Sequence, residues 1–170
     1  RRPRNIEAIA GVRREVSVLP RLRNLLVLPV PVMQIVEVGD EIVTLHPRLP
    51  GEPLESVQNL SNLTKEHLAT QLGSFLKSLH EIESVVLSDI DLPCIDQRWW
   101  TSFLDKAEQF VFPKLTSTTA KVLRSQIQSH IEQLPNLPCV LRHGDFGSSN
   151  ILWDDDKNIT GVIDFGSLGW

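Results

Sequence analysis

The stretch VLRHGDFGSSNILWDDDKNITGVIDFG, residues 140–166, decides the fold that we predict for this 170-residue chain. It contains two short apolar runs, ILW at 151–153 and GVI at 161–163, whose residues favour β-strands. The polar run DDDKNIT between them has the composition of a turn. The stretch therefore predicts an antiparallel β-hairpin.

The register of this hairpin decides which side chains meet at its open end. With a hairpin that is symmetric about Lys157, Ile151 faces Ile163. In the same register, Asn150 faces Asp164. Directly opposed residues of antiparallel strands lie about 5 Å apart on one face of the sheet. We therefore expect an amide oxygen and a carboxylate to meet there, and such hard oxygen ligands suit Mg²⁺.

A third polar residue, Asp145, precedes Asn150 by five residues, with the run FGSS between them. Small residues allow a tight loop that turns Asp145 back toward the mouth of the hairpin. Phosphoryl transfer requires such a set: Asp145 would orient a hydroxyl and accept its proton, while Asn150 and Asp164 would hold the metal. The run DDD at 154–156 offers an alternative metal site, but a solvated hairpin loop is the better interpretation.

The composition is that of one globular domain or a large part of one, with 41% hydrophobic and 22% charged residues. No run is long and apolar enough for a membrane helix, and the Arg-rich start lacks the apolar core of a signal peptide. We therefore expect a cytoplasmic protein with no membrane partner, in which Cys94 and Cys139 stay reduced.

Charge is distributed unevenly along the chain. Residues 1–30 hold seven Arg against Glu7 and Glu15, a net charge of +5, which leaves −9 for the remainder of a chain with a formal net charge of −4. An acidic body argues against binding to nucleic acid and suits a cationic small molecule. The alternative interpretation is an ordinary acidic, solvated surface.

Helical periodicity and turn residues predict the order of the elements. A helix is expected from Asn5, with Pro20 at its end or at a kink, followed by a hairpin about residues 39–40. The connector PRLPGEPL comes next. Three helices are then expected, at about residues 64–82, 96–112 and 120–134. Thr64 is the predicted N-cap of the first of them.

Strands and helices are segregated by region in this order, which predicts an α+β fold rather than a doubly wound sheet. The natural boundary between two lobes lies near residues 50–51. We therefore expect a partial N-terminal lobe over residues 1–50 and a C-terminal lobe over residues 51–170.

The motif HGDFGSSNIL, followed by GVIDFG, resembles the catalytic and metal-binding loops of the aminoglycoside phosphotransferase family, which shares the protein-kinase-like fold. The resemblance implies that Asp145 is the catalytic aspartate and that Asn150 and Asp164 bind magnesium. It implies a mainly structural role for His143. The ordered set of motifs is more specific than any one of them, because an isolated HGD also occurs in surface turns.

The first half of the chain agrees with this resemblance. RREVSVLPRL resembles the family's helix whose Glu pairs with the nucleotide-binding Lys, which implies that role for Glu15; the alternative is an exposed helix Glu paired locally with Arg. LPGEPL resembles the connector after the inter-lobe hinge, which implies that Leu45, His46 and Arg48 lie at a hinge beside a purine edge. Arg1 takes the place of the phosphate-contacting Lys, a departure, because a guanidinium fork is not equivalent to an ammonium.

The resemblance implies a two-lobe kinase-like fold, with a helix and antiparallel strands in the N-terminal lobe and a mainly helical C-terminal lobe that carries the catalytic hairpin. The implied enzyme transfers phosphate from ATP or GTP, with Mg²⁺, to a hydroxyl of an aminoglycoside or related antibiotic, and so confers antibiotic resistance.

Two alternatives stay open. Kinases of choline, homoserine, methylthioribose and fructosamine share much of the motif set, so the acceptor could be another small metabolite. The chain does not begin with Met and ends just after a motif, so we expect a fragment, truncated at its C-terminus and inactive by itself. A non-catalytic kinase-like module is therefore the second alternative.

Overall fold

The computed structural model describes residues 3, 6–39, 41–57, 59–156 and 158–170. They form two compact units, of which the larger comprises residues 1–92 and 140–169, and the smaller comprises residues 93–139 and Trp170. Helices and antiparallel strands occupy separate segments, so the predicted α+β class is confirmed. The lobe boundary near residue 50 stays a prediction.

Helix α1 of the larger unit spans Ile6–Leu22. Its buried residues recur at helical spacing and include Val12, Glu15, Val18, Leu19 and Leu22. Pro20 lies in the last turn, and the helix continues for two residues beyond it. Beside it, Arg21 forms a two-pronged ion pair with Asp89, with 2.7 Å between Nη2 and Oδ2. This pair joins the end of α1 to the segment that follows helix α2 (Asn62–His80).

Strands β1 (Gln34–Val38) and β2 (Glu41–Leu45) form a two-stranded antiparallel sheet. Val38 pairs with Glu41, so the predicted hairpin about residues 39–40 is confirmed. Gly39 takes a φ of 61° in the turn, a conformation that glycine adopts without steric cost.

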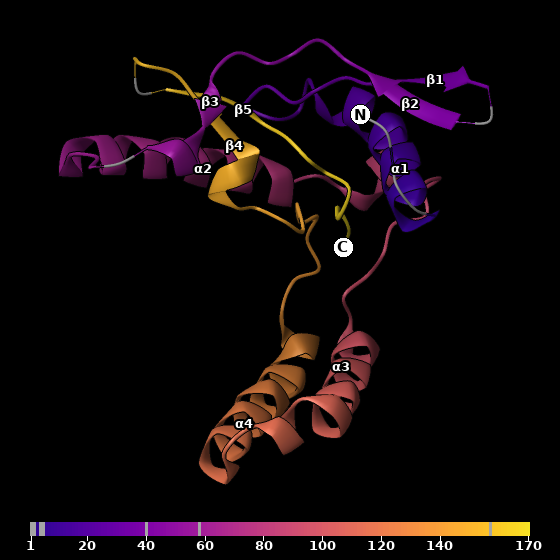
Figure 1. Ribbon diagram of the computed structural model, residues 1–170, viewed down its shortest axis with the longest axis vertical. Coiled ribbons are helices and arrows are strands. Elements are labelled where there is room, and N and C mark those ends of the chain that lie inside the picture. Colours follow the sequence, from indigo (N-terminus) through magenta and orange to yellow (C-terminus); the bar gives the residue numbers. More distant parts are fainter. Residues whose placement is uncertain (1–2, 4–5, 40, 58, 157) are drawn as a thin grey trace. The chain divides into compact units, whose positions relative to one another are not determined.

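A second sheet has three antiparallel strands in the order β3-β4-β5, which span Glu52–Pro53, Ile151–Trp153 and Ile159–Val162. It lies beside helix α2 (Asn62–His80), as Figure 1 shows. The N–H of Ile159 donates to Oε1 of Gln71 at 2.7 Å, which joins sheet and helix by a hydrogen bond. Leu68 of α2 is buried with Ile151 and Ile159 in one apolar cluster.

The start of α2 differs from the prediction. Ser61 is the N-cap, and its Oγ accepts a hydrogen bond from the N–H of Thr64 at 3.1 Å. The two hydroxyl oxygens also lie 2.7 Å apart. The prediction of Thr64 as the N-cap was wrong, because Ser61 stands three residues earlier and supplies the oxygen that the first turn needs.

The smaller unit consists mainly of two helices that lie side by side (Figure 1), α3 (Gln97–Phe110) and α4 (Ser117–Gln133). Their N-caps are Asp96 and Thr116, so both predicted helices are confirmed. Their shared core contains Leu104, Ala107, Phe112 and Ala120, with Leu123, Ile127 and Ile131 packed against it.

Short 3₁₀ turns complete the fold, at Leu54–Ser56, Ser84–Leu87, Phe112–Lys114, Leu134–Asn136 and Ser148–Asn150. Among the described residues, no helix has both the length and the apolar character needed to cross a bilayer.

Candidate active site

The hairpin of β4 and β5 has a register one residue away from the predicted one. Ile151 pairs with Val162 instead of Ile163. The N–H of Ile163 donates to the carbonyl oxygen of Asn150 at 2.9 Å. The predicted pairing of Asn150 with Asp164 is therefore wrong, and Asp164 lies one residue beyond the pair.

A shorter loop and one extra residue cause this shift. Asp154 and Asn158 close the loop with two hydrogen bonds of 3.0 Å, from Asn158 N–H to Asp154 Oδ1 and from Asp154 N–H to the Asn158 carbonyl. Ile159, which the prediction placed in the turn, is buried in β5. Thr160 is the extra residue of a β-bulge, because Trp153 pairs with Ile159 while the next pair continues at residue 161.

Asp164 reaches the site through its backbone conformation. Its φ is 64°, in the left-handed region that residues other than glycine rarely adopt. At this turn its side chain lines a cavity of about 280 Å³, together with Asp145 and Glu15. Strained backbone of this kind persists only where the surroundings hold it, and it is common at functional sites. The site therefore gathers the two predicted aspartates even though the register differs.

Asn150 is buried and bonded to Asp145. Its Nδ2 donates to the Asp145 carbonyl oxygen at 2.9 Å and to the Asp145 Oδ2 at 3.1 Å. An amide has two donor hydrogens on nitrogen and its acceptor on oxygen. With the nitrogen turned toward Asp145, Oδ1 is the atom left to face a cation, and one carboxylate oxygen of Asp145 is fixed by the contact.

His143 lies behind the site and is almost fully buried. Its Nδ1 accepts a hydrogen bond from the N–H of Asp145 at 3.2 Å, so the ring hydrogen is on Nε2, which donates to the carbonyl oxygen of Ile163 at 3.1 Å. Burial lowers the pKa of His143, and the carboxylates of Asp145 and Asp164 oppose this only in part. The neutral ring joins the two segments that carry the aspartates, as the expected structural role requires.

Glu15 enters the site from α1 and is 1% exposed. A Cβ built on Gly166 would lie 3.0 Å from Glu15 Oε1 and 3.5 Å from Asp164 Oδ1, so both carboxylates border Gly166. The alternative of an exposed helix Glu is excluded by this burial. The predicted pairing with a phosphate-binding cation stays a prediction, and Arg1 lies outside the described residues.

Of the three residues predicted at a hinge, His46 lines a cavity that Glu15 and Asp164 also line. This second cavity, of about 210 Å³, is also lined by Pro31, Met33 and Ile163. Leu45 is exposed, and Arg48 is exposed and paired with Glu52 at 2.9 Å, so neither side chain lines this cavity. The sequence analysis missed the apolar walls Pro31, Met33 and Ile163, because their apolar runs look like ordinary core.

The donor set fits a magnesium ion. No three His, Cys, Asp or Glu side chains converge on a possible metal site anywhere in the described part of the chain. Mg²⁺ does not need such a cage, since it is usually held by one or two carboxylates together with water and phosphate oxygens. The predicted ligands, the Asp164 carboxylate and the Asn150 amide oxygen, are of the chemical type that Mg²⁺ takes. Asp155 and Asp156 are exposed in the hairpin loop, as expected of a solvated turn.

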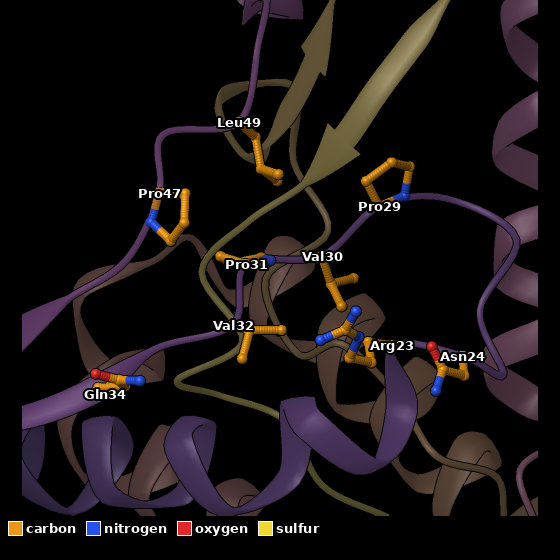
Figure 2. A pocket seen from close by; sticks show the side chains of 9 residues that line it. All are labelled: Arg23, Asn24, Pro29, Val30, Pro31, Val32, Gln34, Pro47 and Leu49. Atoms are coloured by element: carbon orange, nitrogen blue, oxygen red, sulfur yellow. The ribbon is translucent and has the colours of Figure 1, made fainter.

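A larger cavity, of about 550 Å³, holds none of the predicted site residues. Figure 2 shows its lining, which comes from residues 23–34 and 47–49: Arg23, Asn24, Pro29, Val30, Pro31, Val32, Gln34, Pro47 and Leu49. Only Pro31 also lines the 210 Å³ cavity. Volume alone therefore does not identify a candidate site, and the smaller cavity is the one that Asp145 and Asp164 line.

Known proteins resemble this chain over much of its length. Residues 1–170 match the model of a family described as the phosphotransferase enzyme family. The chain is 26% identical to viomycin phosphotransferase of Streptomyces vinaceus over 125 residues, which cover 72% of the chain and 43% of that protein.

Solved structures show the same fold. The GDP and kanamycin complex of APH(2")-IIia matches with a TM-score of 0.87 and 22% identity, over 99% of this chain and 60% of that one. The gentamicin complex of APH(2")-IIa matches with a TM-score of 0.61 and 27% identity, over 99% and 58% respectively. The predicted kinase-like fold is thus confirmed. The chain spans between 43% and 60% of the length of these relatives.

Proposed function

The chain belongs to the phosphotransferase enzyme family, and from this premise we propose that it forms the catalytic part of a kinase that phosphorylates a hydroxyl group of an antibiotic. The observation that carries the proposal is the cavity that Asp145 and Asp164 share, with Asn150 bonded to the Asp145 carboxylate. The names of the relatives support the acceptor class, since they include a viomycin phosphotransferase and complexes with kanamycin and gentamicin.

Asp145 is the proposed proton acceptor. Asn150 donates to Oδ2 of Asp145, and we assign the second carboxylate oxygen to the acceptor hydroxyl. The hydroxyl oxygen attacks the terminal phosphorus of the nucleotide, the bond to the bridging oxygen breaks, and the hydroxyl proton passes to Asp145. The products are a phosphate ester and a nucleoside diphosphate. Such positioned general-base catalysis contributes roughly 10²- to 10⁴-fold to a rate.

Asn150 and Asp164 are the proposed ligands of Mg²⁺. When bound, the ion would neutralise charge on the nucleotide phosphates. Asp164 lines the cavity. The amide nitrogen of Asn150 donates to the Asp145 carboxylate, which leaves the amide oxygen of Asn150 for the ion. Asn150 would thus be both a ligand of the metal and a hydrogen-bond partner of the proton acceptor, Asp145.

The nucleotide, ATP or GTP, is proposed to occupy the 210 Å³ cavity. Pro31, Met33 and Ile163 supply apolar surface for a base, and His46 brings the hinge backbone to its edge. Structural relatives include GDP complexes, which supports a nucleotide as co-substrate. Leu45 and Arg48 are proposed to flank the hinge. Glu15 is proposed to pair with a phosphate-binding cation, which the sequence assigns to Arg1.

The acceptor is proposed to be cationic, because the chain after residue 30 carries a formal net charge of −9. A small metabolite with a hydroxyl group remains the alternative acceptor, and the same assay distinguishes the two.

The proposal is tested by phosphoryl transfer with the protein in its natural reading frame. Mg-ATP or Mg-GTP is supplied with kanamycin, gentamicin, viomycin, a macrolide, choline and homoserine, and the products are identified by mass spectrometry. We expect one phosphate on at least one antibiotic, and no product after the metal is chelated. Asp145→Asn should lower kcat by about 10²- to 10⁴-fold. Asp155→Asn, in the exposed hairpin loop, is the matched control and should leave kcat unchanged.

Nucleotide binding without a phosphorylated antibiotic would refute the antibiotic kinase, and transfer to choline or homoserine would establish the metabolite kinase instead. Calorimetric titration of the 170-residue chain with Mg-nucleotide tests the expectation that this chain alone is inactive, since tight binding would contradict it.

A further inference from the structure

Arg14 of α1 contacts the segment that follows the proposed metal ligand. Its Nη1 donates to the carbonyl oxygen of Gly166 at 3.0 Å, across 152 residues of sequence. Gly166 is only two residues beyond Asp164, whose left-handed φ must be held by its surroundings. A charged donor on a neutral carbonyl gives a stronger hydrogen bond than an uncharged one.

Gly11, one turn earlier on α1, faces the same place. A Cβ on Gly11 would lie 3.4 Å from the Gly166 oxygen and 3.6 Å from its Cα, so helix backbone and loop backbone are in near contact. Residues three and four apart share one face of a helix. Gly11, Arg14 and Glu15 therefore present one face of α1 to Gly166.

The other side of this segment is held by the chain that leads into Asp145. Arg142 and Gly169 exchange two backbone hydrogen bonds, of 2.8 and 3.2 Å. The φ of Gly144 is +88°, and a Cβ there would lie 2.0 Å from the Ser167 oxygen, so these backbones also touch. Residues 166–169 are thus enclosed between α1 and the segment that carries the proposed proton acceptor.

We propose that Arg14 is a positioning residue, which holds the Gly166 carbonyl so that Asp164 keeps its carboxylate in the cavity that it shares with Glu15 and Asp145. This inference rests on the proposed function for its catalytic consequence only. Arg14 fixes the distance between helix α1 and the proposed metal ligand, so the carboxylates of Glu15 and Asp164 keep their positions relative to each other. Without this bond, the strained backbone of Asp164 relaxes and its carboxylate leaves the cavity more often.

Hydrogen exchange of the 170-residue chain tests the positioning role independently of activity. In Arg14→Ala, the amides of residues 165–168 should exchange about 10-fold faster, the effect expected for one lost hydrogen bond of this kind. Arg13→Ala removes the neighbouring exposed Arg and should leave these amides unchanged. Arg14→Lys keeps a charged donor on a shorter side chain, so the exchange rates of these amides should rise less than in Arg14→Ala. If the alanine variant does not fold, the lysine variant tests the inference.

Kinetics then test the catalytic consequence in the natural reading frame. Arg14→Ala should raise the Mg²⁺ concentration for half-maximal rate about 10-fold, with the KM of the acceptor unchanged. Equal exchange and equal Mg²⁺ dependence in the Arg14 and Arg13 variants would overturn the inference. If the unaltered protein transfers no phosphate, the proposed function fails, while the exchange rates still decide whether Arg14 holds the loop.

Discussion

At the residue scale, a single imidazole ring connects the two segments of the candidate site. His143 accepts from the N–H of Asp145 and donates to the carbonyl of Ile163, the residue before Asp164. Both bonds need the neutral ring with its hydrogen on Nε2. A protonated ring would turn a donor toward the Asp145 N–H, so protonation breaks the first bond and places a buried charge beside the site.

His143 should therefore make stability depend on pH. Burial lowers its pKa in the folded protein below the 6.5 of the unfolded chain, so the unfolded chain binds the proton first as pH falls. The contribution to the free energy of unfolding is fully present above about pH 6.5 and is lost as pH falls from there through the folded pKa. Chemical denaturation at a series of pH values measures this decline.

The variant His143→Gln is the informative comparison for this pH dependence. Its amide keeps a donor for the Ile163 carbonyl and an acceptor for the Asp145 N–H, but it does not titrate. We expect a lower free energy of unfolding at pH 8 and a flatter pH profile between pH 5 and 7. An unchanged slope would assign the pH dependence to other groups.

The residues of the site were predictable to different degrees. Asp145, Asn150 and Asp164 follow from an ordered motif; Asp145 and Asp164 line one cavity, and Asn150 is bonded to Asp145, while their roles stay predictions. The left-handed backbone of Asp164 was not predictable, since no local pattern requires it. Arg14 was missed because its partner, Gly166, lies 152 residues away and offers only a backbone carbonyl.

At the scale of elements, the hairpin shows where prediction from pattern ends. Two strands and a turn were foreseen, but the register was not, because a symmetric count assigned Ile159 to the turn. Burial of its β-branched side chain favours the strand, and the Asp154–Asn158 bonds close a shorter loop. A bulge at Thr160 then absorbs the extra residue. Bulges depend on packing on both faces of a strand, which sequence alternation does not specify.

The contact between the segments at residues 144 and 167 gives a prediction for Gly144→Ala. The residue combines a φ of +88° with a Cβ position 2.0 Å from the backbone oxygen of Ser167. Backbone strain alone costs about 1–3 kcal/mol, and the oxygen belongs to a segment held by further backbone bonds. We expect Gly144→Ala to lower the free energy of unfolding by about 2–4 kcal/mol, measured by urea denaturation.

Gly73→Ala is the matched control for this substitution. Gly73 lies inside α2, and nothing comes within 4 Å of a Cβ built there. Alanine is favoured over glycine in a helix by about 0.5–1 kcal/mol, so this variant should be stabilised by that amount. Equal effects of the two substitutions would show that residues 144 and 167 are not in the close contact described.

At the scale of the whole molecule, the candidate chemistry belongs to one of the two units. Every predicted site residue lies within residues 1–92 or 140–169, the range of the larger unit. The smaller unit has its own apolar core between α3 and α4, and it contributes none of these residues. A site carried by one unit needs no particular placement of the other for its own geometry.

Separate cores predict separate cooperative unfolding, because each unit can open without exposing the apolar cluster of the other. Leu104→Ala removes a buried side chain from the smaller unit, and Leu68→Ala removes one from the larger unit. Truncation of a buried leucine costs about 2–5 kcal/mol, which corresponds to roughly 30-fold or more in local opening. Leu104→Ala should therefore accelerate hydrogen exchange by that factor in α3 and α4, with α2 unchanged.

The reciprocal variant makes the comparison decisive. Leu68→Ala should accelerate exchange in α2 and the β4–β5 hairpin and leave α3 and α4 at their original rates. The two leucines are 4% and 8% exposed, so the truncations are closely matched in burial. If either variant accelerates exchange equally in all of these elements, the chain unfolds as one cooperative unit, and a disturbance in the smaller unit would then reach the aspartate cavity through global unfolding.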